Sequence, residues 1–140
     1  MNDNFLQVFH NSELKTKEEV FAFIAKQANP DDQEALADLL LKREDVGSTL
    51  IAPEIILPHL ESERVQRSQI LFIKFREPID WDQKTGPVKL AIVIILKQNE
   101  EQTVKVAISQ FTRTLADEEY LAELLIEENS EAFYRKIRRN

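Results

Sequence analysis

The first third of the chain has hydrophobic residues at helical spacing. The segment Thr16 to Glu19 has the pattern of a capping box, in which the Thr16 hydroxyl accepts from a first-turn amide and Glu19 reaches back, so we predict a helix there. The segment Asn29 to Asp32 should end this helix at its proline and cap the next helix. We predict that the second helix ends near Arg43. The hydrophobic residues that the two helices carry are Val20, Phe21, Ile24, Ala28, Leu36, Leu39 and Leu40.

The middle of the chain has the composition of β-strands. Thr49 to Leu57 is rich in Ile and Leu but contains Pro53, which predicts two short extended pieces or one bent strand. Ile70 to Phe75 predicts a second strand, which should end among the turn residues around Pro78 and Asp80.

After a predicted turn at Thr85 to Pro87, Val88 to Leu96 is almost continuously apolar, as expected of a strand buried on both faces at the centre of a sheet. From Gln102 onward the spacing is helical again, and Asp117 and Ser130 are predicted to cap two further helices. Their inward residues, with those of the helix from Gln102, are Val104, Ile108, Phe111, Leu115, Leu121, Leu124, Leu125, Phe133 and Ile137. This alternation predicts one α/β domain over residues 1–140, with a central sheet flanked by helices on both faces.

Composition and charge narrow the classes of function. The 140 residues suit a single domain, and the absence of cysteine excludes disulfides, thiolate nucleophiles and sulfur-ligated metals. A net charge of −7 has the wrong sign for binding nucleic acid. Two glycines, Gly47 and Gly86, cannot build the glycine-rich loops that bind nucleotides. Two histidines, His10 and His59, exclude a three-histidine metal site, and we predict no metal.

The hydropathy pattern also bears on location. The longest apolar run, Leu90 to Leu96, has seven residues, far fewer than the ~20 of a membrane-spanning helix. The segment Met1 to Asn4 lacks the basic and then apolar pattern of a secretory signal. We therefore predict no membrane insertion and a cytoplasmic location.

The residues best suited to chemistry lie between Lys42 and His59. His59 follows an apolar run and is preceded by Arg43 and by the hydroxyls of Ser48 and Thr49. Neutral imidazole is a competent nucleophile, arginine binds phosphate oxygens with two parallel hydrogen bonds, and hydroxyls add neutral donors. The set suits phosphoryl chemistry. From the residues alone, a structural histidine at the end of a strand stays the alternative.

These motifs resemble a known family. Arg43-Glu44, Gly47-Ser48-Thr49 and an apolar run closing on Pro58-His59 are similar to the enzyme IIA domain of the phosphoenolpyruvate-dependent sugar phosphotransferase system, fructose/mannitol type. The resemblance continues through Pro78 to Asp82, the strand Val88 to Leu96, and Asp117 to Tyr120. It implies a central mixed β-sheet flanked by helices, with no nucleotide, other cofactor or metal.

The resemblance also implies roles for individual residues. His59 would accept a phosphoryl group from the phosphohistidine of the phosphocarrier HPr and pass it to an enzyme IIB domain for sugar uptake. Arg43 matches the family's active-site arginine, and Ser48 and Thr49 match its neighbouring hydroxyls. The chain would then be a phosphoryl transferase that works through a phosphohistidine intermediate.

One position departs from the family pattern. Family members commonly carry a second histidine early in the helix after the buried strand, where this chain has Val104, or Thr103 in a shifted alignment. Neither side chain donates a hydrogen bond as imidazole does. This departure favours an alternative in which the chain is a regulatory module, similar to nitrogen-type or activator-associated enzyme IIA domains. Phosphorylation of His59 would then control binding to a partner such as a transcriptional regulator.

Overall fold

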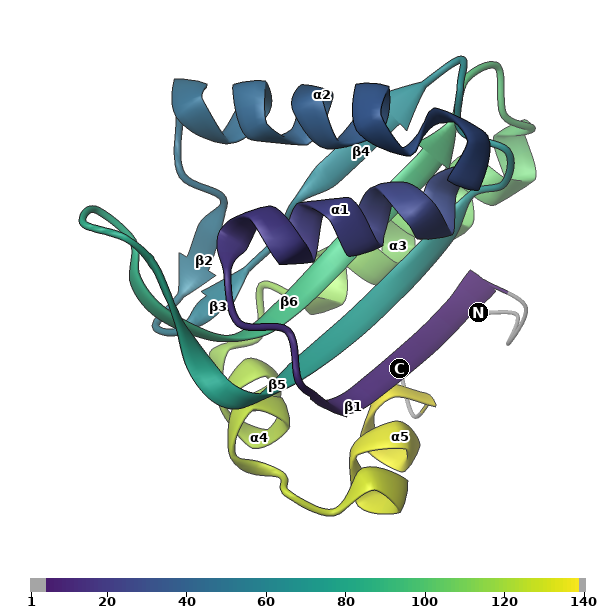
Figure 1. Ribbon diagram of the computed structural model, residues 1–140. Helices are drawn as coiled ribbons and strands as arrows, with labels where there is room; N and C mark the ends of the chain where they lie inside the picture. Colours follow the sequence, from purple (N-terminus) through teal and green to yellow (C-terminus); the bar gives the residue numbers. More distant parts are fainter. Residues whose placement is uncertain (1–4, 139–140) are drawn as a thin grey trace.

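A long antiparallel pair of strands, β5 (Gln69–Asp82) and β6 (Gly86–Lys97), forms the centre of the sheet in the computed structural model, which describes residues 5–138 (Figure 1). On one side, β1 (Leu6–Ser12) pairs parallel with β5. On the other, β3 (Ile55–Ile56) and β4 (His59–Ser62) pair parallel with β6, and β2 (Leu50–Ala52) pairs antiparallel with β3. The predicted mixed sheet is confirmed.

Helices cover both faces of this sheet, as predicted. On one face lie α1 (Lys17–Ala28) and α2 (Gln33–Val46), joined by the short 3-10 helix η2 (Pro30–Asp32). On the other lie α3 (Gln102–Thr114), α4 (Glu118–Ile126) and α5 (Ser130–Arg138). No helix among the described residues is long and apolar enough to cross a membrane.

The two central strands separate two hydrophobic clusters. Leu71 and Ile73 of β5 pack with the α1–α2 cluster, whereas Ile70 and Phe72 pack with the α3–α5 cluster. Alternate side chains of a strand point to opposite faces, so a strand buried on both faces must be apolar throughout. The prediction for Val88 to Leu96 is confirmed by β6, whose residues from Leu90 to Ile95 are all buried.

Helix capping agrees with the sequence at Thr16 and Asp117, and only in part at Asn29, which caps the short η2, whereas Asp32 at the start of α2 makes no side-chain capping bond. Thr16 accepts from the amide of Glu19, Asn29 from that of Asp31, and Asp117 from those of Glu119 and Tyr120. The prediction for Ser130 is wrong. Ser130 is the first residue of α5, and the side chain of Asn129 caps the helix by accepting from the amide of Ala132 at 2.9 Å.

Two predicted boundaries are wrong because contacts between distant elements extend the local structure. The strand from Ile70 does not end near Pro78 and Asp80: β5 continues to Asp82, with a change of register between Lys74 and Ile79 that accommodates the proline. The second helix continues past Arg43 to Val46, which places Glu44 on its buried face.

The apolar run before His59 forms the two short pieces β2 and β3, one of the two arrangements predicted. His59 does not end this strand, as the sequence suggested, but begins β4. The pairing with β6 keeps one offset from Ile55↔Leu90 to His59↔Ile94, so β3 and β4 follow one path along β6. Pro58 interrupts that path because proline has no amide hydrogen for the ladder.

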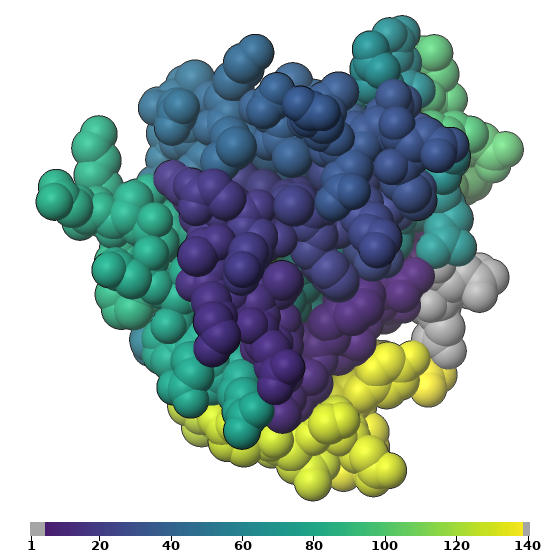
Figure 2. Space-filling model, in the orientation of Figure 1, coloured from purple at the N-terminus to yellow at the C-terminus, as the bar shows by residue number. Residues whose placement is uncertain are grey.

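The first strand and the last helix lie side by side. Figure 2 shows the N-terminal part of the chain, in purple, against the C-terminal helices, in yellow. The ring of His10 on β1 contacts that of Phe133 on α5, with 5.3 Å between centroids, and its Nε2 lies 3.4 Å from the carbonyl oxygen of Glu127. His10 thus has the structural role of a polar residue on an N-terminal strand.

Candidate functional site

His59 is exposed at the start of β4. Leu60, the next residue, packs in the α1–α2 cluster, while Ile55 and Leu57 pack with the α3–α5 cluster. By strand alternation, His59 lies on the same face as Ile55 and Leu57, the face covered by α3 to α5. Its imidazole forms no hydrogen bond or ion pair with any described residue. It is therefore an accessible nitrogen base.

The backbone that carries His59 is firmly held. The carbonyl oxygen of Pro58 accepts from the amide of Ile94 at 3.0 Å, and Pro58 itself is buried. The amide of Leu57 donates to the carbonyl oxygen of Thr49 at 2.9 Å. These bonds fix the two residues before His59 to the central strand on one side and to the loop after α2 on the other.

Arg43 lies in the last turn of α2, on the helix that covers the opposite face of the sheet. Its side chain is exposed, and Nη1 donates to the carbonyl oxygen of Gly47 at 3.4 Å. It forms no ion pair with a described residue, so its charge is free to meet an anion. No hydrogen bond joins Arg43 to His59.

The hydroxyls of Ser48 and Thr49 are both engaged within the protein. Ser48 Oγ lies 3.0 Å from Thr85 Oγ1 and accepts from the amide of Leu50 at 3.1 Å. Thr49 Oγ1 donates to Glu44 Oε1 at 3.0 Å. The structure thus brings Arg43, Ser48 and Thr49 together at the end of α2, and Thr49 is linked to the His59 segment through Leu57.

Thr85, the hydrogen-bond partner of Ser48, lies in the β5–β6 turn, and two contacts of Asp82 stabilise this turn. The amide of Thr85 donates to Asp82 Oδ1 at 2.7 Å, and this bond lowers the pKa of the Asp82 carboxyl. Lys17 of α1 pairs with the same carboxylate at 3.7 Å and favours its charged form further. The turn is thereby fixed against α1.

Val104 is the third residue of α3 and is half-buried. It packs against the cluster that contains Ile94, the strand partner of His59, whereas Thr103 is exposed. The described structure therefore places an aliphatic side chain, with no donor, on the side of α3 nearest the His59 face of the sheet.

Sequence reasoning missed Glu44, which is 6% exposed and accepts hydrogen bonds from Thr49 and Trp81. A charged residue beside Arg43 near a helix end is usually solvated. A signal did exist, because Leu36, Leu40 and Glu44 recur at a spacing of four residues, which puts Glu44 on the buried stripe of the helix.

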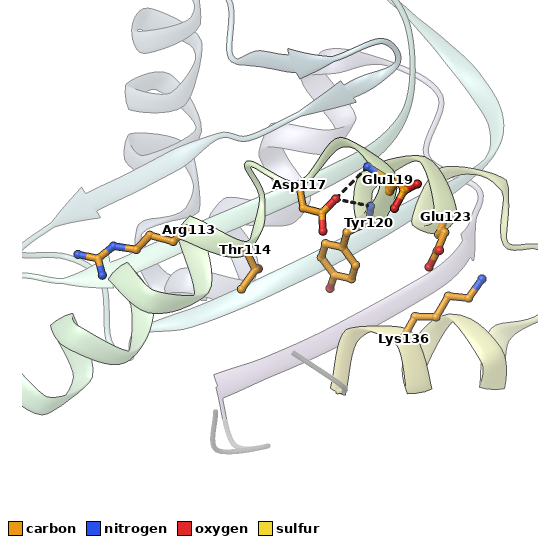
Figure 3. Close-up of a pocket in the computed structure, with 7 residues that line it drawn as sticks. All are labelled: Arg113, Thr114, Asp117, Glu119, Tyr120, Glu123 and Lys136. Carbon is orange, nitrogen blue, oxygen red and sulfur yellow. Dashed lines mark hydrogen bonds between the residues drawn. The ribbon is translucent and has the colours of Figure 1, made fainter.

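A hollow of about 410 Å³ lies elsewhere, among α3, α4 and α5 (Figure 3). Two of its charged groups stabilise the helices: Asp117 caps α4, and Lys136 Nζ pairs with Glu127 Oε1 at 2.9 Å. None of the predicted site residues lines it. Among the described residues, no three or more His, Asp or Glu side chains gather as a metal site would require.

Comparison with known proteins decides the family. Residues 4–140 match the family described as "Phosphoenolpyruvate-dependent sugar phosphotransferase system, EIIA 2". The chain belongs to this family. The resemblance noted in the sequence is thereby confirmed for this EIIA chain.

Relatives and solved structures place the chain among several kinds of EIIA protein. It is 22% identical over 129 residues to the multiphosphoryl transfer protein of Shigella flexneri, covering 89% of this chain but only 16% of that protein. The nitrogen regulatory protein IIA-Ntr of Neisseria meningitidis superposes with a TM-score of 0.74 at 18% identity, covering 96% of this chain and 97% of that one. Enzyme IIAMTL of Escherichia coli, solved in complex with phosphorylated enzyme IIBMTL, gives 0.68 at 20% identity, covering 96% and 99%. These likenesses confirm the fold.

Proposed function

We propose that this EIIA chain relays a phosphoryl group through His59, taking it from the phosphohistidine of HPr and passing it to an enzyme IIB domain. The observation that carries the proposal is the His59 imidazole, which is exposed and without a hydrogen bond to any described residue, on a backbone fixed by the bonds of Leu57 and Pro58. A relay needs a nucleophile that two different partners can reach in turn. The phosphorylated IIB partner of the related IIAMTL supports the second half of this relay.

In the transfer step, a ring nitrogen of His59 attacks the phosphorus of the donor phosphohistidine in line with the bond that breaks. A new N–P bond forms as the donor N–P bond breaks, and the donor nitrogen leaves with the electron pair. Catalysis of such transfers rests on positioning and on electrostatic support of the equatorial oxygens. Arg43, exposed and without an ion pair, is the cation we assign to those oxygens.

Ser48 and Thr49 have a different part in this proposal. Ser48 is exposed and can exchange its bond to Thr85 for one to a phosphoryl oxygen. Thr49 is held by Glu44, so it supports the loop. Both remain in the proposed site, with Ser48 as the donor nearer to solvent.

A second candidate function is regulation. The resemblance assigns Val104, or Thr103 in a shifted alignment, to the position where family members commonly carry a second histidine, and the fold is similar to that of a nitrogen regulatory protein. In this version phosphorylation of His59 changes which protein the chain binds, for example a transcriptional regulator. Slow onward transfer would then be an advantage, because the phosphorylated state must last long enough to be detected.

The test is to incubate the chain with phosphoenolpyruvate, enzyme I and HPr, and to measure acid-labile phosphate on the protein. His59→Ala should abolish labelling. His10→Ala is the matched control because it removes the other histidine of the chain, and it should label normally. Normal labelling of His59→Ala would refute the proposal. Discharge of the label by an enzyme IIB domain then separates the relay from the regulatory candidate.

A further inference from the structure

Glu44 is a buried carboxylate with no role in the transfer step proposed above. It is 6% exposed, and no Lys or Arg among the described residues forms an ion pair with it. A buried charge without a counter-ion is costly unless hydrogen bonds satisfy it. The partners of Glu44 therefore indicate what holds it in place.

Those partners come from the loop directly after α2 and from β5. Glu44 Oε1 accepts from Thr49 Oγ1 at 3.0 Å, and Oε2 lies 3.4 Å from the amide nitrogen of Thr49. Oε2 also accepts from Trp81 Nε1 on β5 at 3.3 Å. All three partners are donors, which suits an ionised carboxylate and does not suit a neutral amide.

The tryptophan is a rigid support. Trp81 is 4% exposed and packs edge-to-face on Phe21 of α1, with 5.4 Å between ring centroids. Glu44 is therefore fixed relative to the central sheet and to α1, not merely to its own helix. Thr49, its other partner, takes its position from this fixed point.

From Thr49 the connection continues to the nucleophile. The carbonyl oxygen of Thr49 accepts from the amide of Leu57 at 2.9 Å, two residues before His59. The next residue, Pro58, is bonded to the central strand through Ile94. A shift of Thr49 would thus move one of the two supports of the His59 backbone.

We propose that Glu44 is a positioning residue for phosphoryl transfer: through Thr49 and Leu57 it sets the place of His59 relative to the central sheet. The inference rests on the proposed function of His59. In-line transfer is sensitive to position, since a displacement of about 1 Å can slow a reaction up to a hundredfold. The carboxylate acts through other residues and touches no phosphoryl group.

The test compares Glu44→Gln with Asp45→Asn, a matched control that neutralises the neighbouring exposed carboxylate. Glutamine keeps one acceptor but turns an N–H toward a donor, so the bond to Trp81 or Thr49 is lost. Trp81 is the only tryptophan, so its indole N–H cross-peak in a proton–nitrogen NMR spectrum reports the change directly. The backbone amide of His59 reports whether the change reaches the nucleophile.

For Glu44→Gln we expect both cross-peaks to move and the transfer rate at saturating phospho-HPr to fall about tenfold. The half-saturating concentration of phospho-HPr should stay within about twofold, because docking surfaces are unchanged. Asp45→Asn should match wild type in every measurement. Trp81→Phe, which removes the indole donor together with part of the buried ring but leaves the Glu44 carboxylate and its bonds to Thr49, is the second variant and should give a smaller loss of rate.

A wild-type transfer rate in Glu44→Gln with a displaced indole cross-peak would overturn the inference, and so would an unmoved His59 amide. Failure of the proposed function looks different. In that case the wild-type chain itself takes no label on His59, while the NMR spectra still decide whether Glu44 positions His59.

Discussion

Among residues 5–138, each face of the sheet buries one charged side chain, and the two are held in different ways. On the α1–α2 face, Glu44 is bonded to the side chains of Thr49 and Trp81 and to the Thr49 amide. On the α3–α5 face, Lys74 is 2% exposed, and its Nζ donates to the carbonyl oxygens of Leu124 at 2.7 Å and Glu127 at 2.8 Å.

The two buried charges hold different parts of the chain in place. Carbonyl groups in the last turn of a helix lack partners within the helix, and Lys74 satisfies two such groups at the end of α4. It therefore fastens a helix to the sheet. Glu44 fastens a loop that is bonded to the segment before His59. Burial alone does not distinguish a charge that stabilises the fold from one that positions a functional residue. The hydrogen-bond partners of the charged group make this distinction.

The largest expected effect tests Lys74 as a purely structural charge. Burial lowers the pKa of Lys74 from 10.5 to about 8. The nearby carboxylates of Glu128 and Glu127 have the opposite effect, because they favour the charged form, but burial dominates. Between these two pH values the unfolded chain keeps a proton that the folded chain has lost, so the free energy of unfolding rises with pH. The cost of burying the charge is present in full below pH 8 and is gone above 10.5.

At ~1.4 kcal/mol per pKa unit, this contribution is about 3 kcal/mol. The free energy of unfolding of wild type and of Lys74→Met can be measured with urea from pH 7 to pH 11. Over this range the wild-type value should rise by that amount relative to the value for Lys74→Met. Phosphoryl transfer at pH 7 should stay within about twofold of wild type, because Lys74 contacts no residue of the proposed site. If the free energies of unfolding of the two proteins change in parallel with pH, or if phosphoryl transfer is largely lost, Lys74 is not the purely structural charge described here.

The next effect concerns Val104, which lies on the same face as Lys74 but near the strand partner of His59. A hydrogen bond to a charged group is worth roughly 1.5–3 kcal/mol, so Val104→His should speed transfer from phospho-HPr about ten- to a hundredfold. The measurement is rapid-quench transfer. Val106→His, on the exposed side of the same helix, is the control and should leave the rate unchanged. An unchanged rate in a folded Val104→His would contradict the assignment.

The smallest effect concerns Arg43, at the end of the helix that carries Glu44. Arg43→Lys keeps the charge but loses the planar, two-pronged geometry, so transfer should slow about tenfold, by more than HPr binding weakens. Single-turnover rates and titrations with HPr separate the two quantities. Equal losses in both, or none in either, would make Arg43 a structural residue through its bond to Gly47.

Elements that depend on neighbouring residues were predictable from the sequence. The caps at Thr16, Asn29 and Asp117 act within three residues, and the apolar run of β6 carries its own signal. The continuation of β5 beyond Pro78 was not predictable, because its pairing with β6, which begins again at Ile79 and Val88, maintains it.

The same distinction between local patterns and long-range contacts applies to the candidate site. The residue types around His59 are visible in the sequence and led to the family that the comparison confirms. Their contacts were not visible. Glu44 meets Trp81 across 37 positions of sequence and Lys74 meets Leu124 across 50, so the partners of neither charge could be read from a local pattern, although the spacing of Leu36, Leu40 and Glu44 indicates that Glu44 faces the core.

The arrangement of β1 has a consequence for the order in which the chain folds. The strands β5 and β6 are joined by a short turn and can pair early, whereas β1 must close a long loop to reach β5, at a cost in chain entropy. Because α5 then packs against β1, the two ends of the chain complete the same edge of the sheet together. We therefore expect that edge to open more readily than the centre of the sheet, so its backbone amides should exchange with solvent before those of the central hairpin.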